Sequence, residues 1–151
     1  MAFPNHGTNG TNGQIRALEC RPGAEYDEET FLYFLAIERA RAERANRRLR
    51  LLLATLELVA GKPDPIRPSN AARLFEGLRL SLRDTDVMGW YRQDRVAGAV
   101  LCEPPGALVC EMSDLIEQRV GEGLRQRLPS SVARSLRVRV VHQGPRRLGN
   151  G

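Results

Sequence analysis

The sequence has little of what a disulfide framework, a membrane protein or a metalloprotein requires. Its 151 residues include 3 cysteines, an odd number with no Cys-x-x-Cys pair, and 2 histidines that lie far apart. Such scattered residues form neither a set of internal disulfides nor a zinc site. The longest apolar run, LRLLLATLELVA, is interrupted by Glu57 and is shorter than the roughly 18 residues of a membrane helix. We therefore expect a cytoplasmic protein without a metal, a cofactor or a membrane-spanning segment.

Lysine and aromatic residues are also scarce. Lys62 is the only lysine, so arginine carries nearly all of the net charge of +5, and aromatic residues make up 5% of the chain. Arginine can fork onto phosphates, but the charges in ERARAERANRR alternate in sign, which is typical of a solvated helix face. The expected strands offer no aromatic platform of the RNA-recognition type. Nucleic acid is therefore not an expected partner.

One ordered domain is expected between residues 27 and 142, because the chain is long enough to bury a single core. Residues 1–26 contain GTNGTNG and other polar stretches with little to bury, and they lack the basic start and apolar core of a signal peptide. Residues 143–151 read QGPRRLGNG, which is similarly poor in apolar side chains. We predict a disordered N-terminal tail and a flexible C-terminal tail on either side of the domain.

Hydrophobic periodicity divides this domain into alternating helices and strands. It predicts helices over 27–47, 69–82 and 113–128 and strands over 50–58, 87–91, 96–102 and 136–141. Ser69 is the expected N-cap of the second helix, and Ser113 or Asp114 that of the third. In the third helix, Leu115 and Ile116 are expected to face the core.

The order of these elements favours one fold class. After the first helix comes strand, helix, strand, strand, helix, strand, and right-handed crossovers place the two strand-helix-strand units side by side. The result is an α+β, ferredoxin-like fold, an antiparallel βαββαβ sheet with helices on one face, preceded by an extra N-terminal helix. Because this fold serves many functions, the function must be argued from individual residues.

A short motif narrows the choice. Arg83-Asp84-Thr85-Asp86 is followed by the five residues VMGWY and then by RQDRV at the expected hairpin turn. This spacing resembles the GGDEF domain of bacterial diguanylate cyclases, which carries an Arg-x-x-Asp pair five residues before its GGDEF turn. The helix LFEGLRLSLRDTD before the turn and the strand AGAVL after it also look like the family, and RLLLATLEL stands where the family has its first metal-binding strand. The resemblance therefore covers about 27–142. It implies a nucleotide-cyclase-like fold.

The resemblance implies an active site at the hairpin turn, and there the sequence departs from the family. Arg92 and Gln93 stand where the family has two glycines that let the nucleotide approach the backbone. Asp94 matches the family's aspartate, but Arg95 replaces the glutamate that serves the metal. Because Mg²⁺ requires oxygen ligands, this charge reversal argues against metal binding.

The first strand departs from the family as well. Where the family has an aspartate, one residue and a second acid, this chain has Thr55 and Glu57, so one carboxylate is missing. Glu57 and Asp94 could meet at adjacent strand ends, where the arginines of the turn would make them a salt-bridge cluster. We interpret this region as a vestigial active site and predict that the protein is not an enzyme, because two-metal phosphoryl transfer needs both metals.

The Arg-x-x-Asp pair itself is intact. In the family this pair is the inhibitory site that binds cyclic di-GMP, so the resemblance implies ligand binding by Arg83 and Asp86. The chemistry is reasonable, since an arginine can fork onto a phosphate or guanine and an aspartate can accept from guanine N–H groups. The alternative is a local role, in which Arg83 binds carbonyls at the helix end and Asp86 caps the turn.

Three hypotheses follow. The first is a catalytically inactive GGDEF-like regulatory module that binds cyclic di-GMP. The second is an interaction-only scaffold without a nucleotide ligand, whose partner is another protein or a second copy of the chain that contacts the polar first helix. The third, an active diguanylate cyclase, is the one that the sequence favours least.

Overall fold

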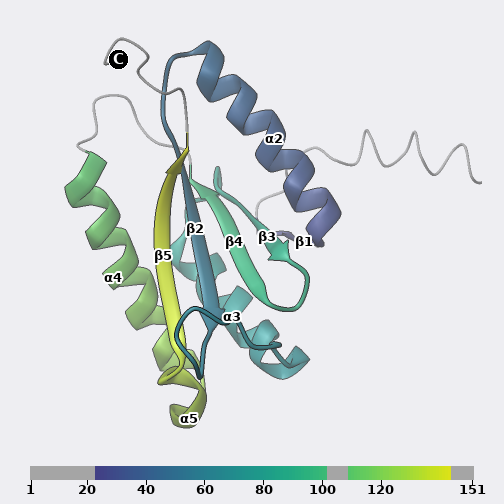
Figure 1. The fold of residues 1–151 in the computed structure, drawn as a ribbon, viewed down its shortest axis with the longest axis vertical. Coiled ribbons are helices and arrows are strands. Elements are labelled where there is room, and N and C mark those ends of the chain that lie inside the picture. Colours follow the sequence, from purple (N-terminus) through teal and green to yellow (C-terminus); the bar gives the residue numbers. More distant parts are fainter. Residues whose placement is uncertain (1–22, 102–108, 144–151) are drawn as a thin grey trace, which may run out of the picture.

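A five-stranded sheet runs through the computed structural model, which describes residues 23–101 and 109–143 (Figure 1). The strands are β1 (Glu25–Tyr26), β2 (Leu49–Leu56), β3 (Val87–Arg92), β4 (Val96–Leu101) and β5 (Leu136–Gln143). The helices are α2 (Glu28–Arg44), α3 (Pro68–Ser81), α4 (Val109–Arg127) and the short α5 (Ser130–Ala133). Among the described helices, none combines the length and apolar character needed to cross a membrane.

The strand order confirms the predicted fold class. The sheet runs β1-β3-β4-β2-β5, with β2 antiparallel to both β4 and β5, and β3 antiparallel to β4. This is the ferredoxin-like βαββαβ arrangement. The apolar β2 lies in the middle, where a continuously hydrophobic strand is expected. β5 forms one edge, and from Leu136 to Val141 its residues alternate between buried or half-buried and exposed, as its sequence predicts.

β1 corrects two predictions. It lies parallel to β3, so the sheet is mixed rather than purely antiparallel. It also falls inside residues 1–26, which we predicted to be a disordered tail, so that prediction was wrong for Glu25 and Tyr26. At the other end β5 reaches Gln143, one residue beyond the predicted boundary. The predictions for residues 1–22 and 144–151 lie outside the described residues.

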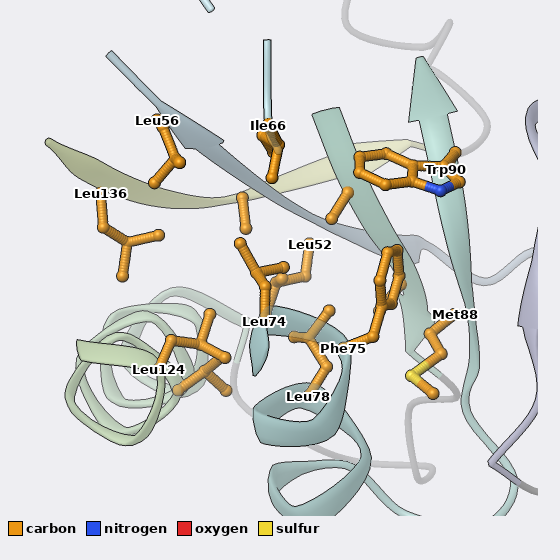
Figure 2. Packing of buried hydrophobic residues seen from close by; sticks show 14 of the residues in the cluster. Leu52, Leu56, Ile66, Leu74, Phe75, Leu78, Met88, Trp90, Leu124 and Leu136 are labelled. Carbon is orange, nitrogen blue, oxygen red and sulfur yellow. The ribbon is translucent and has the colours of Figure 1, made fainter. Parts of the chain in front are cut away.

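Two apolar clusters hold the layers together. α3 and α4 cover one face of the sheet, as predicted, and Figure 2 shows this larger cluster, with Leu74 and Leu78 of α3 on the side of Leu124 of α4. The extra helix α2 covers the opposite face (Figure 1), where Phe31 and Leu35 join the second cluster. Helices therefore lie on both faces, because the first helix is added to a face that the βαββαβ unit leaves open.

Two helix starts differ from the predictions. Arg67 is the N-cap of α3 and Pro68 occupies its first turn, where the fixed φ of proline suits a helix start, so Ser69 lies inside the helix rather than capping it. α4 begins at Val109, so Ser113 and Asp114 also lie inside a helix. Leu115 is 62% exposed rather than in the core, whereas Ile116 packs against the core as predicted.

Candidate functional site

The hairpin tip, residues 92–95, is tied to the loop that follows β2. Thr55 pairs with Val96, which places the end of β2 beside the tip. The backbone N–H of Ile66 donates to the carbonyl of Asp94 at 2.7 Å, and Arg95 Nη1 donates to the carbonyl of Pro63 at 3.1 Å. Asp94 has a φ of 61°, a left-handed conformation that Asp adopts more readily than most residues. The turn therefore closes without glycine.

The same tip is joined to α2 by a reciprocal pair of hydrogen bonds. The N–H of Gln93 donates to Glu28 Oε1 at 2.6 Å, and the N–H of Glu28 donates to Gln93 Oε1 at 3.1 Å. Glu28 is the first residue of α2, so its otherwise unpaired helix N–H finds an acceptor here. The side chain of Gln93, in a position where the family has glycine, thus fixes the start of α2.

Glu57 is a buried carboxylate held by two protein donors. It is 6% exposed, and it accepts from Thr55 Oγ1 at 2.6 Å and from the N–H of Gly61 at 2.9 Å. The hydrogen bonds from Thr55 and Gly61 lower the pKa of Glu57, the positive charges of Arg139 and Arg137 add to this, and burial opposes it. Glu57 is therefore ionised at neutral pH, with its oxygens engaged by its own chain.

The predicted salt-bridge cluster at the tip was wrong. Within residues 23–101 and 109–143, no ion pair joins Glu57 or Asp94 to Arg92 or Arg95. Asp94 instead accepts from Gln93 Nε2 at 3.3 Å, while Arg95 contacts the loop after β2. The described part of the chain also contains no group of three or more His, Cys, Asp or Glu side chains that could hold a metal ion.

We expect Glu57→Gln to reduce stability at pH 7 by about 1–2 kcal/mol, because the neutral amide replaces the charge-assisted hydrogen bonds from Thr55 and Gly61 with weaker neutral ones. Since the pKa of Glu57 is lower in the folded than in the unfolded chain, its carboxylate stabilises the fold above about pH 4.5, the ordinary glutamate value. This contribution is lost as the pH falls through the lowered pKa of the folded state.

Urea unfolding at pH 7 and at pH 3 measures both effects. The difference between wild type and Glu57→Gln should shrink on acidification, whereas the exposed Glu43→Gln on α2 should match wild type at both values. A difference that stays constant with pH would show that the ionised form of Glu57 has no special stabilising role.

Arg83 and Asp86 lie at the opposite end of β3 from the tip, in the turn between α3 and β3. The N–H of Arg83 donates to Asp86 Oδ2 at 2.9 Å, and the N–H of Asp86 donates to the carbonyl of Arg83 at 2.9 Å. The turn thus brings the two predicted binding residues together. Asp86 is buried and closes the turn, which is the local role we considered, while Arg83 is exposed.

Two pockets flank this turn. The first, of about 230 Å³, is lined by Arg83 and Asp86 together with Arg50 and Arg119, and its apolar lining comes from Leu82, Leu101, Met112, Ile116 and Val120. The second, of about 190 Å³, lies beside Arg79, Asp84 and Met88 and shares the same turn. Three arginines and a single aspartate therefore surround the first pocket, which gives it the charge expected of an anion-binding site.

Arg50 and Arg119 were not predicted from the sequence. Arg50 is 2% exposed and lies near the start of β2, where it is the one charged residue of an otherwise mostly apolar strand. Arg119 follows Met112 and Ile116 at helical spacing, and all three line the pocket. A charge within a buried strand is the signal that could have identified Arg50.

The fold of the chain is similar to that of solved structures. Its sequence matches no protein-family model and no curated protein. Among solved structures, a DGC protein from Thermotoga maritima is 15% identical with a TM-score of 0.57, covering 80% of this chain and 81% of that one. The diguanylate cyclase SiaD from Pseudomonas aeruginosa, solved in complex with its activator SiaC, is 14% identical with a TM-score of 0.57, covering 95% of this chain and 57% of SiaD.

Identities this low establish the fold alone. The described residues share the fold of these two proteins, which confirms the nucleotide-cyclase-like fold that the resemblance implied.

Proposed function

We propose that this chain is a regulatory module that binds cyclic di-GMP at the Arg83–Asp86 turn and does not synthesise it. The observation that carries the proposal is the first pocket, where Arg83 and Asp86 share a wall with Arg50 and Arg119. The fold is similar to that of the diguanylate cyclase SiaD, which makes a cyclic guanine dinucleotide the first ligand to test.

The lining of the pocket suits the two parts of such a ligand. Guanidinium groups bind phosphate oxygens with charge-assisted hydrogen bonds, and their planar shape also matches a guanine edge. Met112 and Ile116 provide apolar surface for the face of a base. Because Arg83 is exposed at the turn between the two pockets, it can contact a ligand that enters either one.

The residues at and near the hairpin tip support the proposal that the chain does not synthesise cyclic di-GMP. Cyclisation of GTP needs metal ions that neutralise the developing charge. Here Thr55 contributes no carboxylate, Glu57 is held by Thr55 and Gly61, and Arg95 adds a positive charge where the family has a metal ligand. The chemistry of these side chains favours binding without turnover.

Calorimetric titration of cyclic di-GMP tests the proposal. We expect wild type to bind in the micromolar range and Arg83→Ala to weaken binding about 30-fold, the effect of losing roughly 2 kcal/mol of charge-assisted hydrogen bonding. Arg92→Ala is the matched control, because Arg92 is also an exposed arginine at an end of β3, but at the end opposite to Arg83. Its affinity should equal that of wild type.

Three results would contradict the proposal. No heat from folded wild-type protein would exclude the receptor function and favour the interaction-only scaffold. An equal loss in Arg83→Ala and Arg92→Ala would show general attraction by positive charge instead of a site. Formation of cyclic di-GMP from GTP and Mg²⁺ by wild type would show that the protein is an active cyclase.

A further inference from the structure

Three segments that are far apart in the sequence meet at the end of the sheet where β2 finishes. They are the loop 57–67, the hairpin tip 92–95 and residues 134–139, and together we call them the basic end. The N–H of Glu57 donates to the carbonyl of Ser135 at 2.7 Å, and two further hydrogen bonds join the loop to the hairpin tip. The end of β2 and the neighbouring α5 lie toward the bottom of Figure 1.

Most of the positive charge of the chain is concentrated at the basic end. Its three segments hold seven basic side chains and three acidic ones, so they carry four of the five net positive charges. All seven basic side chains are exposed: Lys62, Arg67, Arg92, Arg95, Arg134, Arg137 and Arg139. In the described part of the chain, none of them forms an ion pair with a carboxylate. This surface therefore attracts an anionic partner.

The loop of the basic end also presents two neighbouring apolar side chains to solvent. Leu58 is 82% exposed and Val59 is 62% exposed. The N–H of Leu58 donates to Asp64 Oδ2 at 2.8 Å, and the N–H of Gly61 donates to Glu57 Oε1 at 2.9 Å, so two of the three acids hold this turn in place. A fixed turn that exposes an apolar pair among basic side chains is typical of a surface that binds a partner.

The apolar pair, Leu58 and Val59, indicates which anionic partner fits. The phosphates of a nucleic acid would attract the basic side chains but would not bury the apolar pair. A protein partner would have to supply a fitted surface of about 1,000 Å², to which a short turn contributes little. The boundary between the headgroups and acyl chains of a bilayer accepts apolar side chains without a fitted pocket, and anionic headgroups attract basic ones.

We propose that the basic end docks on an anionic lipid bilayer, with the apolar pair entering the interface and the basic side chains contacting the headgroups. Arginine suits this role because its guanidinium group makes charge-assisted hydrogen bonds to phosphate oxygens. The docking is peripheral and requires no membrane-spanning helix. It leaves the pocket at Arg83 open, because that turn lies at the opposite end of β3 from the hairpin tip.

Co-sedimentation of the full chain with lipid vesicles, in the absence of nucleotide, tests the docking. We expect binding to vesicles of phosphatidylcholine mixed with phosphatidylglycerol and much weaker binding to vesicles of phosphatidylcholine alone. Lys62→Glu should weaken binding to the mixed vesicles about tenfold, because it replaces an attraction by a repulsion next to the apolar pair. Arg48→Glu is the matched control, since Arg48 is exposed at the other end of β2, and its effect should stay below about twofold.

The double variant L58S/V59S tests the apolar pair without changing any charge. It should weaken binding to the mixed vesicles about tenfold, because less apolar surface then leaves water. Leu80→Ser is its matched control, since Leu80 is 64% exposed on α3, outside the basic end, and binding should not change. Circular dichroism confirms that each variant is folded.

Three results would overturn the proposal. Folded wild type that does not bind the mixed vesicles would assign the basic end to an acidic protein instead. Equal losses in Lys62→Glu and Arg48→Glu would show attraction by net charge alone, and wild-type binding by L58S/V59S would exclude entry of the apolar pair. Because cyclic di-GMP is absent from this experiment, the lipid docking and the receptor function can fail separately.

Discussion

Replacing Phe75 with alanine is expected to lower the free energy of unfolding by about 3–5 kcal/mol, a large part of the 5–15 kcal/mol typical of a domain. Phe75 is 0% exposed and belongs to the larger cluster, where it lies near Trp90 and Met88 (Figure 2). Its ring meets that of Trp90 edge-on, with the ring centroids 5.0 Å apart and the planes at 78°. Truncation removes this contact and leaves a cavity that its rigid neighbours cannot fill.

Urea unfolding followed by Trp90 fluorescence measures this loss, since Trp90 is the only tryptophan. Leu80→Ala is the matched control on the same helix, because Leu80 is 64% exposed and should change the free energy by less than about 1 kcal/mol. If Phe75→Ala is too unstable to purify, Phe75→Leu gives a smaller loss at the same place. Equal effects of Phe75→Ala and Leu80→Ala would show that this cluster is not the main source of stability.

Gly89→Val is the second substitution with a large expected effect, a loss of about 3 kcal/mol. Gly89 lies in β3 opposite Tyr26 of β1, and a Cβ atom at this position would stand 2.6 Å from the carbonyl oxygen of Tyr26. The obstacle is backbone, which cannot rotate away. Strand propensity alone predicts the opposite sign, because valine favours a strand and glycine weakens it.

The sign of the change therefore identifies its cause. Arg92→Val at the exposed end of the same strand is the control, since β1 pairs only with Met88 and Gly89 in β3. It should leave the unfolding free energy unchanged or raise it slightly. A Gly89→Val protein as stable as wild type would mean that β1 does not hold its place against β3.

The fold could be predicted from local patterns where those patterns are strong. A strand buried on both faces is continuously apolar, which identified β2, and a strand buried on one face alternates, which identified β5. An exposed turn is polar, which identified residues 92–95 before β4. β1 could not be predicted in this way. It has 2 residues and exists only because Gly89, far along the chain, leaves room for Tyr26.

The candidate sites show the same division. The Arg-x-x-Asp spacing identified Arg83 and Asp86, which the turn does bring together, and their binding of cyclic di-GMP stays a prediction. Arg50 and Arg119 join the same pocket only after β2 and α4 have packed, so no local spacing links them. For the same reason the sequence suggested that Glu57 would contact the arginines of the tip, whereas the fold gives it Thr55 and Gly61.

The contacts of the hairpin tip also have an evolutionary consequence. Gln93 changed to glycine, the residue of the GGDEF signature, would lose the side-chain oxygen that accepts from Glu28 at the start of α2. Arg95 changed to glutamate would lose its contact with Pro63. Each of these two steps toward the GGDEF signature is therefore expected to cost stability. Selection acting on one mutation at a time would oppose a change of the present turn to that signature.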